Sequence, residues 1–231
     1  FEEELGSFHG LLPGVATSSG TTALHLALLS LGVGPGDEVL LPSYVCSAPL
    51  HAVYHSGATP ILVDVDPTNG NIDPEDIKKR LTSKSKAIIV VHLFGLPANV
   101  REISALGLPV IEDCAQALGA ELASRKVGTF GRVAICSFYA TKIITTGEGG
   151  MLLSSDPDLL ARSRDLRDYD KKEDLNPRFN YKMTDLQAAL GRSQFQKLER
   201  FLDQRGELAR VYNEQLAALP CTLPSAQEGR I

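Results

Sequence analysis

Lys142 has the sequence setting of a chemically active lysine. An apolar run at 133–136 (VAIC) is typical of a buried strand, and a turn of small, hydroxylated and glycine-rich residues follows it (SFYATKIITTGEGG, 137–150). The nearest charged neighbours of Lys142 in sequence are Arg132 and Glu148, so we expect a partly desolvated amine. Such an amine is a usable nucleophile and can form a Schiff base. The alternative is a lysine that only ends a strand.

Two further groups stand at predicted strand ends. Asp113 closes a predicted strand at 109–111, and a carboxylate at the carboxyl end of a parallel strand points into the crevice where such sheets bind ligands. Residues 18–22 (SSGTT) open a predicted helix, and the amides at a helix N-terminus form a ready anion site, commonly for phosphate. Each group also fits an ordinary helix cap, so neither decides the function alone.

Together these features match what pyridoxal phosphate (PLP) needs from a protein. The lysine forms the imine, the carboxylate keeps the pyridine nitrogen protonated, and the helix end holds the phosphate. Ser137, five residues before Lys142, can add a hydroxyl to the phosphate site. The combination therefore predicts a PLP site.

Alternating strands and helices must position these residues. Continuous apolar strands separated by helical patterns predict an α/β fold with a mostly parallel central sheet and helices on both faces. The strands are expected at 15–17, 38–41, 60–65, 87–91, 109–111, 133–136 and 151–153. The helices are expected at 21–31, 47–55, 73–81 and 99–106, with a long helical region at 185–219 and a charged surface loop at 168–178.

Composition excludes several classes of partner. The 231 residues carry a net charge of -5, which argues against nucleic acid or a membrane surface as the main partner. No apolar run approaches the roughly 18 residues of a membrane span. The four cysteines stand far apart, without a Cys/His cluster, so we expect reduced thiols, no metal site and a cytoplasmic protein. His25 is expected to be a packed side chain, whereas His92 ends a strand near the crevice and is a candidate for contact with substrate.

The sequence resembles the DegT/DnrJ/EryC1/StrS family, the sugar aminotransferases among the fold type I PLP-dependent transferases. The matching blocks cover nearly the whole chain in order: 16–28, 34–44, 57–67, 110–120, 126–131, 137–150 and 180–191. The resemblance implies a PLP-binding large domain at 1–219 that includes the long helical region. It also implies that 220–231 start a C-terminal small domain that is largely absent from this sequence.

The resemblance also implies a role for each matching residue. Lys142 would be the Schiff-base lysine and the base that moves the proton. Asp113 would pair with the pyridine nitrogen, and Gln116 would reach the ring hydroxyl of the cofactor. The residues that hold the phosphate would be Gly20, Thr21 and Ser137.

Two positions carry further implications of the resemblance. Asn180 would contact the phosphate of the neighbouring subunit, which implies a homodimer with a shared active site. The aromatic residue that stacks on the pyridine ring in the family aligns here with Cys46. Either Tyr44 takes over that stacking or the ring has a thinner cover.

The predicted activity is a PLP-dependent transfer of an amino group from an amino acid, glutamate by resemblance, to a keto-sugar linked to a nucleotide. One alternative is a sugar dehydratase of the same family, in which a histidine replaces the lysine, so Lys142 counts against it. Another is a PLP-binding member without transaminase activity, regulatory or truncated, which Cys46 and the short C-terminus favour. A nicotinamide-dependent dehydrogenase is disfavoured because no GxGxxG follows the first strand.

Overall fold

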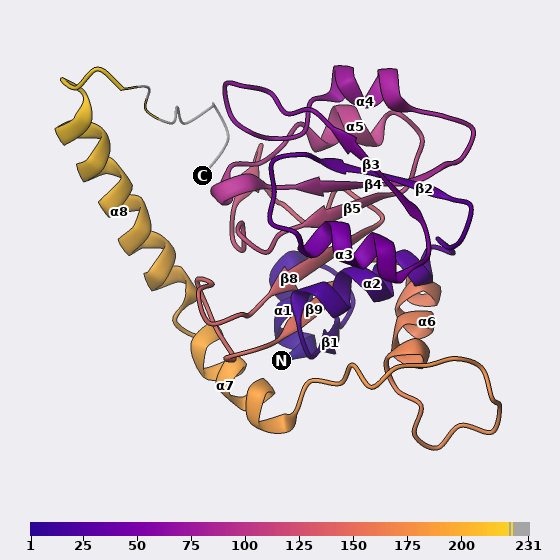
Figure 1. Ribbon diagram of the computed structural model, residues 1–231. Coiled ribbons are helices and arrows are strands. Elements are labelled where there is room, and N and C mark those ends of the chain that lie inside the picture. The colour runs from indigo at the N-terminus through magenta and orange to yellow at the C-terminus, as the bar shows by residue number, and fades with distance from the viewer. Residues whose placement is uncertain (222, 224–231) are drawn as a thin grey trace.

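A seven-stranded mixed sheet forms the centre of the computed structural model, which describes residues 1–221 and 223 (Figure 1). In spatial order its strands are β1 (Val15–Thr17), β9 (Gly150–Leu153), β8 (Val133–Ser137), β5 (Val110–Asp113), β4 (Ser85–Val91), β2 (Glu38–Pro42) and β3 (Thr59–Val63). β9 runs antiparallel to both of its neighbours, whereas all other pairs in this sheet are parallel. A small separate hairpin pairs β6 (Glu121–Leu122) with β7 (Arg125–Lys126).

Helices cover both faces of the sheet, as the sequence predicted. The helices of the described residues are α1 (Glu2–His9), α2 (Gly20–Ser30), α3 (Ala48–His55), α4 (Pro74–Arg80), α5 (Val100–Ser104), α6 (Pro157–Arg167), α7 (Asp185–Phe195) and α8 (Leu198–Leu216), with a short 3-10 turn, η1 (Leu93–Gly95). Apolar side chains from α2, α3 and α6 share one buried cluster with the sheet. α4 and α5 share a second cluster with its opposite face.

β4 shows how one strand serves both clusters. Ile89 and Val91 pack in the cluster of α2 and α3, whereas Ile88 and Val90 pack in that of α4 and α5. Successive side chains of a strand point to opposite faces, so an unbroken apolar run fills both layers. The continuous run AIIVV therefore indicates a strand that is buried on both sides.

The sequence analysis missed two helices and one helix break. α1 and α6 were not expected, although Asp156 before Pro157 is a recognisable start signal for α6: its side chain accepts the N–H groups of the first turn. The helical region expected at 185–219 is two helices, α7 and α8, which are separated at Gln196 and Lys197. α8 projects from the body, and only Leu198 of it is buried (Figure 1).

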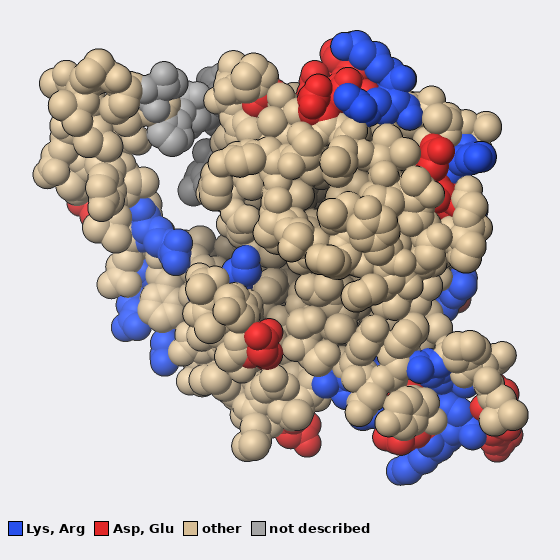
Figure 2. Space-filling view, viewed as in Figure 1, with Lys and Arg blue, Asp and Glu red and all other residues tan. Residues whose placement is uncertain are grey.

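On the face that Figure 2 shows, the charged side chains lie in patches. Figure 2 shows charged side chains gathered over α4 and over the loop after α6, with a largely uncharged face between them. Among the described residues no helix is long and apolar enough to cross a membrane. The expected start of a small domain at 220–231 lies outside the described residues except for 220, 221 and 223.

Candidate active site

The register of the sheet brings the predicted site residues to one edge. Thr17 and Ser137 both pair with Gly150, so the ends of β1 and β8 are level. On the next strand, Asp113 pairs with Ile135 of β8. Because parallel strands present their carboxyl ends at the same edge, the residues that follow them can form one site.

The start of α2 forms an anion cradle next to Ser137. The Ser19 hydroxyl accepts the N–H of Thr22 at 3.1 Å, and the Thr22 hydroxyl accepts the N–H of Ser19 at 3.0 Å. This capping box leaves the N–H groups of Gly20 and Thr21 without an acceptor among the described residues. A Cβ at Gly20 would come within 2.9 Å of the Ser137 Cβ, so the helix end and the hydroxyl lie in contact. Two free N–H groups beside a hydroxyl fit a phosphate.

Asp113 is buried with incomplete hydrogen bonding. It is 4% exposed, and its Oδ1 accepts the N–H of Ala115 at 2.9 Å. Burial raises the pKa of the carboxyl, while the Ala115 hydrogen bond and the charge of Lys142 act in the opposite direction. Within the described part of the chain, Oδ2 has no hydrogen-bond partner. A positively charged N–H donor would complete this carboxylate, and a protonated pyridine nitrogen is such a donor.

Lys142 is half-buried in the loop that joins β8 to β9. Phe138, with a fully buried ring, anchors this loop: its N–H donates to Gly149 O at 2.9 Å and its carbonyl accepts the N–H of Thr146 at 2.9 Å. The N–H of Lys142 donates to Tyr139 O at 2.9 Å. These backbone hydrogen bonds fix the backbone of Lys142. Among the described residues its ammonium forms no ion pair, so Nζ stays available.

Gln116 is oriented by a backbone group. Its Oε1 accepts the N–H of Phe94 at 3.0 Å, so its NH₂ group remains available to donate to an acceptor in the site. Gln116 and Lys142 line a pocket of about 890 Å³ between α8 and the rest of the molecule. Figure 2 shows a hollow between α8 and the body. A phenolic oxygen of a bound cofactor fits the donor that Gln116 offers.

Glu112 faces the opposite side of β5, as the alternation of a strand requires. It is fully buried, and its two carboxylate oxygens accept four hydrogen bonds of 2.6–3.0 Å. The donors are His92 Nε2 and the N–H groups of Gly128, Phe130 and Gly131. Burial opposes ionisation, yet the bonds from His92 and the backbone lower the pKa of Glu112. Glu112 is thus a structural clamp on the 128–131 loop.

His92 belongs to this clamp and not to a substrate site. Its ring is 0% exposed, its Nδ1 accepts the N–H of Ala98 at 3.0 Å, and its Nε2 donates to Glu112. Both ring nitrogens are therefore engaged. The expectation that His92 could contact substrate was wrong, because the histidine turns away from the crevice into the fold.

Asn180 is exposed and lies between two residues that pack inward. The rings of Phe179 and Tyr181 stack with centroids 4.7 Å apart, and His25 packs against Phe179 at 5.1 Å. The Tyr181 carbonyl accepts the N–H of Ser18 at 2.8 Å, which ties this segment to the start of α2. His25 is the packed side chain that the sequence predicted. The role of Asn180 toward a neighbouring subunit stays a prediction.

The position aligned with the stacking aromatic residue offers no ring. Cys46 is exposed, and Tyr44 is 57% exposed with its ring edge-on to Phe94 at 6.5 Å between centroids. Phe94, which lines the same pocket as Gln116 and Lys142, was not predicted from the sequence. Its N–H contact with Gln116 is a backbone interaction, which side-chain motifs do not reveal.

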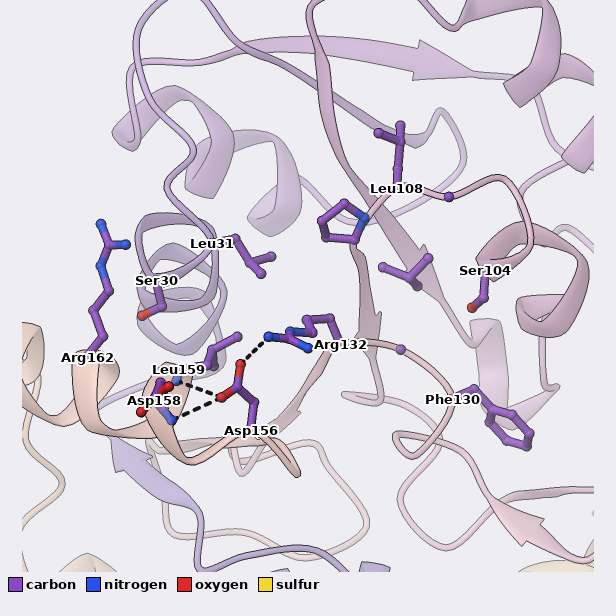
Figure 3. Close-up of a pocket in the computed structure, with 14 residues that line it drawn as sticks. Ser30, Leu31, Ser104, Leu108, Phe130, Arg132, Asp156, Asp158, Leu159 and Arg162 are labelled. Atoms are coloured by element: carbon purple, nitrogen blue, oxygen red, sulfur yellow. Dashed lines mark hydrogen bonds and ion pairs between the residues drawn. The ribbon is translucent and has the colours of Figure 1, made fainter.

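A second cavity, of about 770 Å³, lies at the opposite edge of the sheet, beside the start of β5 and β8 (Figure 3). The Arg132–Asp156 ion pair crosses it, and Arg162 points outward from α6. None of the predicted site residues lines it. The candidate site is therefore the edge that holds Asp113 and Lys142.

The α/β fold, with its mostly parallel seven-stranded sheet, is consistent with the large domain of PLP-dependent aminotransferases. Residues 1–230 match the model of the DegT/DnrJ/EryC1/StrS aminotransferase family. The chain belongs to this family, whose members are PLP-dependent enzymes.

Relatives and solved structures agree with the family match. The chain is 41% identical over 230 residues to GDP-perosamine synthase of Caulobacter vibrioides, covering 95% of this chain and 62% of the relative. It is 39% identical over 236 residues to UDP-N-acetyl-3-dehydro-alpha-D-glucosamine 3-aminotransferase of Acidithiobacillus ferrooxidans, covering 99% and 64%. The structure of S. venezuelae DesV in complex with a ketimine intermediate superposes with a TM-score of 0.94 at 34% identity, covering 100% and 64%. The chain thus spans less than two thirds of each of these proteins.

Proposed function

We propose that the chain is the cofactor-binding part of an aminotransferase that moves an amino group from an amino acid, glutamate in the first instance, to a keto-sugar carried by a nucleotide. The observation that carries this proposal is the convergence of Lys142, Asp113 and the start of α2 on one edge of the sheet, each with unfilled hydrogen-bonding capacity. The names of the relatives, which refer to GDP- and UDP-linked sugars, support the substrate class.

Each residue has a distinct task in this proposal. The N–H groups of Gly20 and Thr21, with the Ser137 hydroxyl, bind the phosphate, and Gln116 donates to the ring hydroxyl. Asp113 keeps a proton on the pyridine nitrogen. When bound, pyridoxal phosphate supplies the electron sink that stabilises negative charge on the reacting carbon.

Lys142 has two tasks, because its amine is the only one that the loop between β8 and β9 offers in the described chain. Its Nζ would hold the cofactor through the aldehyde, with loss of water. When free of the cofactor, the same Nζ would take the proton from the carbon that bears the amino group of the donor and deliver it to the cofactor, and it would run this transfer in reverse for the keto-sugar. A buried carboxylate and a half-buried amine at one edge suit this proton transfer.

We further propose that residues 1–219 form the PLP-binding large domain, that 220–231 start a smaller one, and that two subunits share each active site through Asn180. Asn180 is exposed, whereas the rings of its neighbours Phe179 and Tyr181 pack inward, and this exposure supports a contact across subunits. We expect the homodimer to be cytoplasmic.

The test is the absorption spectrum of the purified chain titrated with pyridoxal phosphate. We expect a visible band, and borohydride reduction should then attach the cofactor covalently to the peptide that contains Lys142, as read by mass spectrometry. Lys142→Ala should lose both signals, whereas Lys84→Ala, at an exposed position, should keep them. A shift of the band by glutamate supports the transaminase. A wild-type chain that binds the cofactor but never responds to amino donors would favour the regulatory alternative.

A further inference from the structure

Phe94 is an exposed aromatic residue in a strained backbone conformation. Its side chain is 75% exposed and its φ is +53°, in the left-handed region that bulky residues rarely adopt. Such a conformation costs about 1–3 kcal/mol and persists only where the surrounding structure imposes it. The fold therefore holds a large apolar ring in water at the expense of backbone strain.

Buried groups fix the turn on both sides of Phe94. The N–H of Leu93 donates to Asn71 Oδ1 at 3.0 Å, and Asn71 Nδ2 donates to Leu96 O at 3.1 Å. After the turn, the N–H of Ala98 donates to His92 Nδ1 at 3.0 Å. Because Asn71 and His92 are themselves buried, the turn cannot relax without breaking the core. The outward position of the Phe94 ring is a consequence of this rigid frame.

The ring stands directly outside the proposed cofactor site. The N–H of Phe94 holds Gln116, and Phe94 lines the same pocket as Gln116 and Lys142. Tyr44 packs edge-on against the ring at 6.5 Å between centroids and an interplanar angle of 73°. Asp113 is 4% exposed, whereas Phe94 and Tyr44 are both more than half exposed, so the two rings lie at the surface while the carboxylate is buried.

We propose that Phe94, supported by Tyr44, is the aromatic rim against which the hexose ring of the sugar substrate packs. This inference rests on the proposed function. The keto carbon must reach the cofactor, so the hexose is the part of the substrate that lies immediately outside it. The C–H face of a sugar ring packs well on an aromatic ring, whereas the charged diphosphate does not, and the base lies beyond the diphosphate.

The experiment compares Phe94→Ala with the wild type in the reverse reaction, with an amino-sugar nucleotide as the amino donor and 2-oxoglutarate as the acceptor that restores the cofactor. The probes are GDP-perosamine and a UDP-linked amino sugar, and whichever one converts the wild type is used. Phe94→Ala should raise the KM for that probe about 10-fold with little change in kcat, which corresponds to about 1.4 kcal/mol. Tyr54→Ala, which removes an aromatic ring of 56% exposure from α3, should change neither constant.

Two further measurements separate the rim from other roles of Phe94. Inhibition by the nucleoside diphosphate without its sugar should be the same for wild type and variant. The affinity for pyridoxal phosphate, read from the absorption titration, should also be unchanged. Phe94→Gly removes the ring and suits a positive φ, so it tests the same proposal if the alanine variant folds poorly.

Three outcomes would overturn the proposal that Phe94 contacts the hexose. The first is an unchanged KM in both variants, and the second is a loss of cofactor affinity. The third is an equal loss of inhibition by the nucleoside diphosphate, which would mean that the ring contacts the base. A wild type that neither forms the cofactor band nor reacts with any amino donor removes the proposed function itself, and the inference falls with it. A wild type that reacts normally while Phe94→Ala matches it removes the inference alone.

Discussion

Glu112 and Asp113 are consecutive residues on β5, both buried, and their hydrogen bonding is opposite. Glu112 accepts four hydrogen bonds on one face of the sheet, and its pKa is lowered. Asp113 accepts one on the other face, and its pKa is raised. A buried carboxylate that the fold uses is saturated with donors, whereas one kept for a ligand retains an unfilled acceptor. The difference marks Asp113, and not Glu112, as the candidate for contact with a ligand.

The largest effect on stability should come from removing Glu112, the carboxylate with four hydrogen-bond donors. Glu112→Ala leaves His92 Nε2 and three backbone N–H groups without an acceptor, so we expect the free energy of unfolding to fall by about 3–5 kcal/mol. Urea unfolding measures it. Asp113→Ala leaves only the N–H of Ala115 without its acceptor, so it is the matched control, and its free energy of unfolding should fall much less. Equal losses in the two variants would contradict the contrast between the two carboxylates.

Asp113→Asn tests the carboxylate with the unfilled acceptor, through its effect on activity instead of stability. The amide cannot hold a positive charge on the pyridine nitrogen, so the rate of transamination should fall about 10²- to 10³-fold. The unfolding free energy at neutral pH should not fall, because the substitution removes a buried charge. Steady-state kinetics and urea unfolding on the same preparation check both parts. Asp158→Asn, at the edge that holds the second cavity, should leave the rate unchanged.

Ser137→Ala should have a smaller effect, limited to the phosphate. A hydrogen bond to a charged group contributes about 1.5–3 kcal/mol, so the Kd for pyridoxal phosphate should rise about 10- to 100-fold. An absorption titration measures it. Ser104→Ala, in the cavity of Figure 3, removes a hydroxyl at the opposite edge and should not change this Kd. A Kd for Ser137→Ala within twofold of the wild type would exclude the hydroxyl from the cradle.

Much of this contrast is visible in the sequence, and some of it is not. The apolar runs predicted all seven strands of the central sheet, including the edge strand β3, which is largely not buried. The alternation of side chains along a strand also accounts for Glu112 and Asp113 facing opposite ways. The antiparallel direction of β9 was not predicted, since an apolar run such as MLL carries no sign of its direction.

The partners of the site residues were harder to predict than the residues themselves. Gln116 owes its orientation to the N–H of Phe94, and Glu112 owes three of its four bonds to backbone groups. Backbone donors are the same at every residue, so no side-chain pattern points to them. His92 was placed correctly at a strand end but was given the wrong role. One of its two partners, the N–H of Ala98, is a backbone group six residues away, and the other is the carboxylate of Glu112 on the neighbouring strand.

The pH dependence of stability offers the finest test of the contrast. Since the pKa of Glu112 is lower in the folded chain, its contribution is present above the unfolded value, near 4.5, and is lost as the pH falls through the folded pKa. The pKa of Asp113 is higher in the folded chain than the unfolded value, near 3.8. The folded state therefore holds that proton more tightly, and stability declines as the pH rises from 3.8 through the folded pKa.

Because the two pKa shifts have opposite signs, the stabilities of the two variants relative to the wild type should change with pH in different ways. The advantage of Asp113→Asn over the wild type should grow as the pH rises above about 3.8 through the raised folded pKa of Asp113, because the wild type then acquires a buried charge with an unfilled acceptor. The deficit of Glu112→Gln should shrink as the pH falls toward 4 and below, because the wild type then loses its own carboxylate. Urea unfolding at a series of pH values gives both curves. Parallel curves for wild type and Asp113→Asn would mean that a donor already completes Asp113, and the site would then lack the open acceptor on which the cofactor assignment depends.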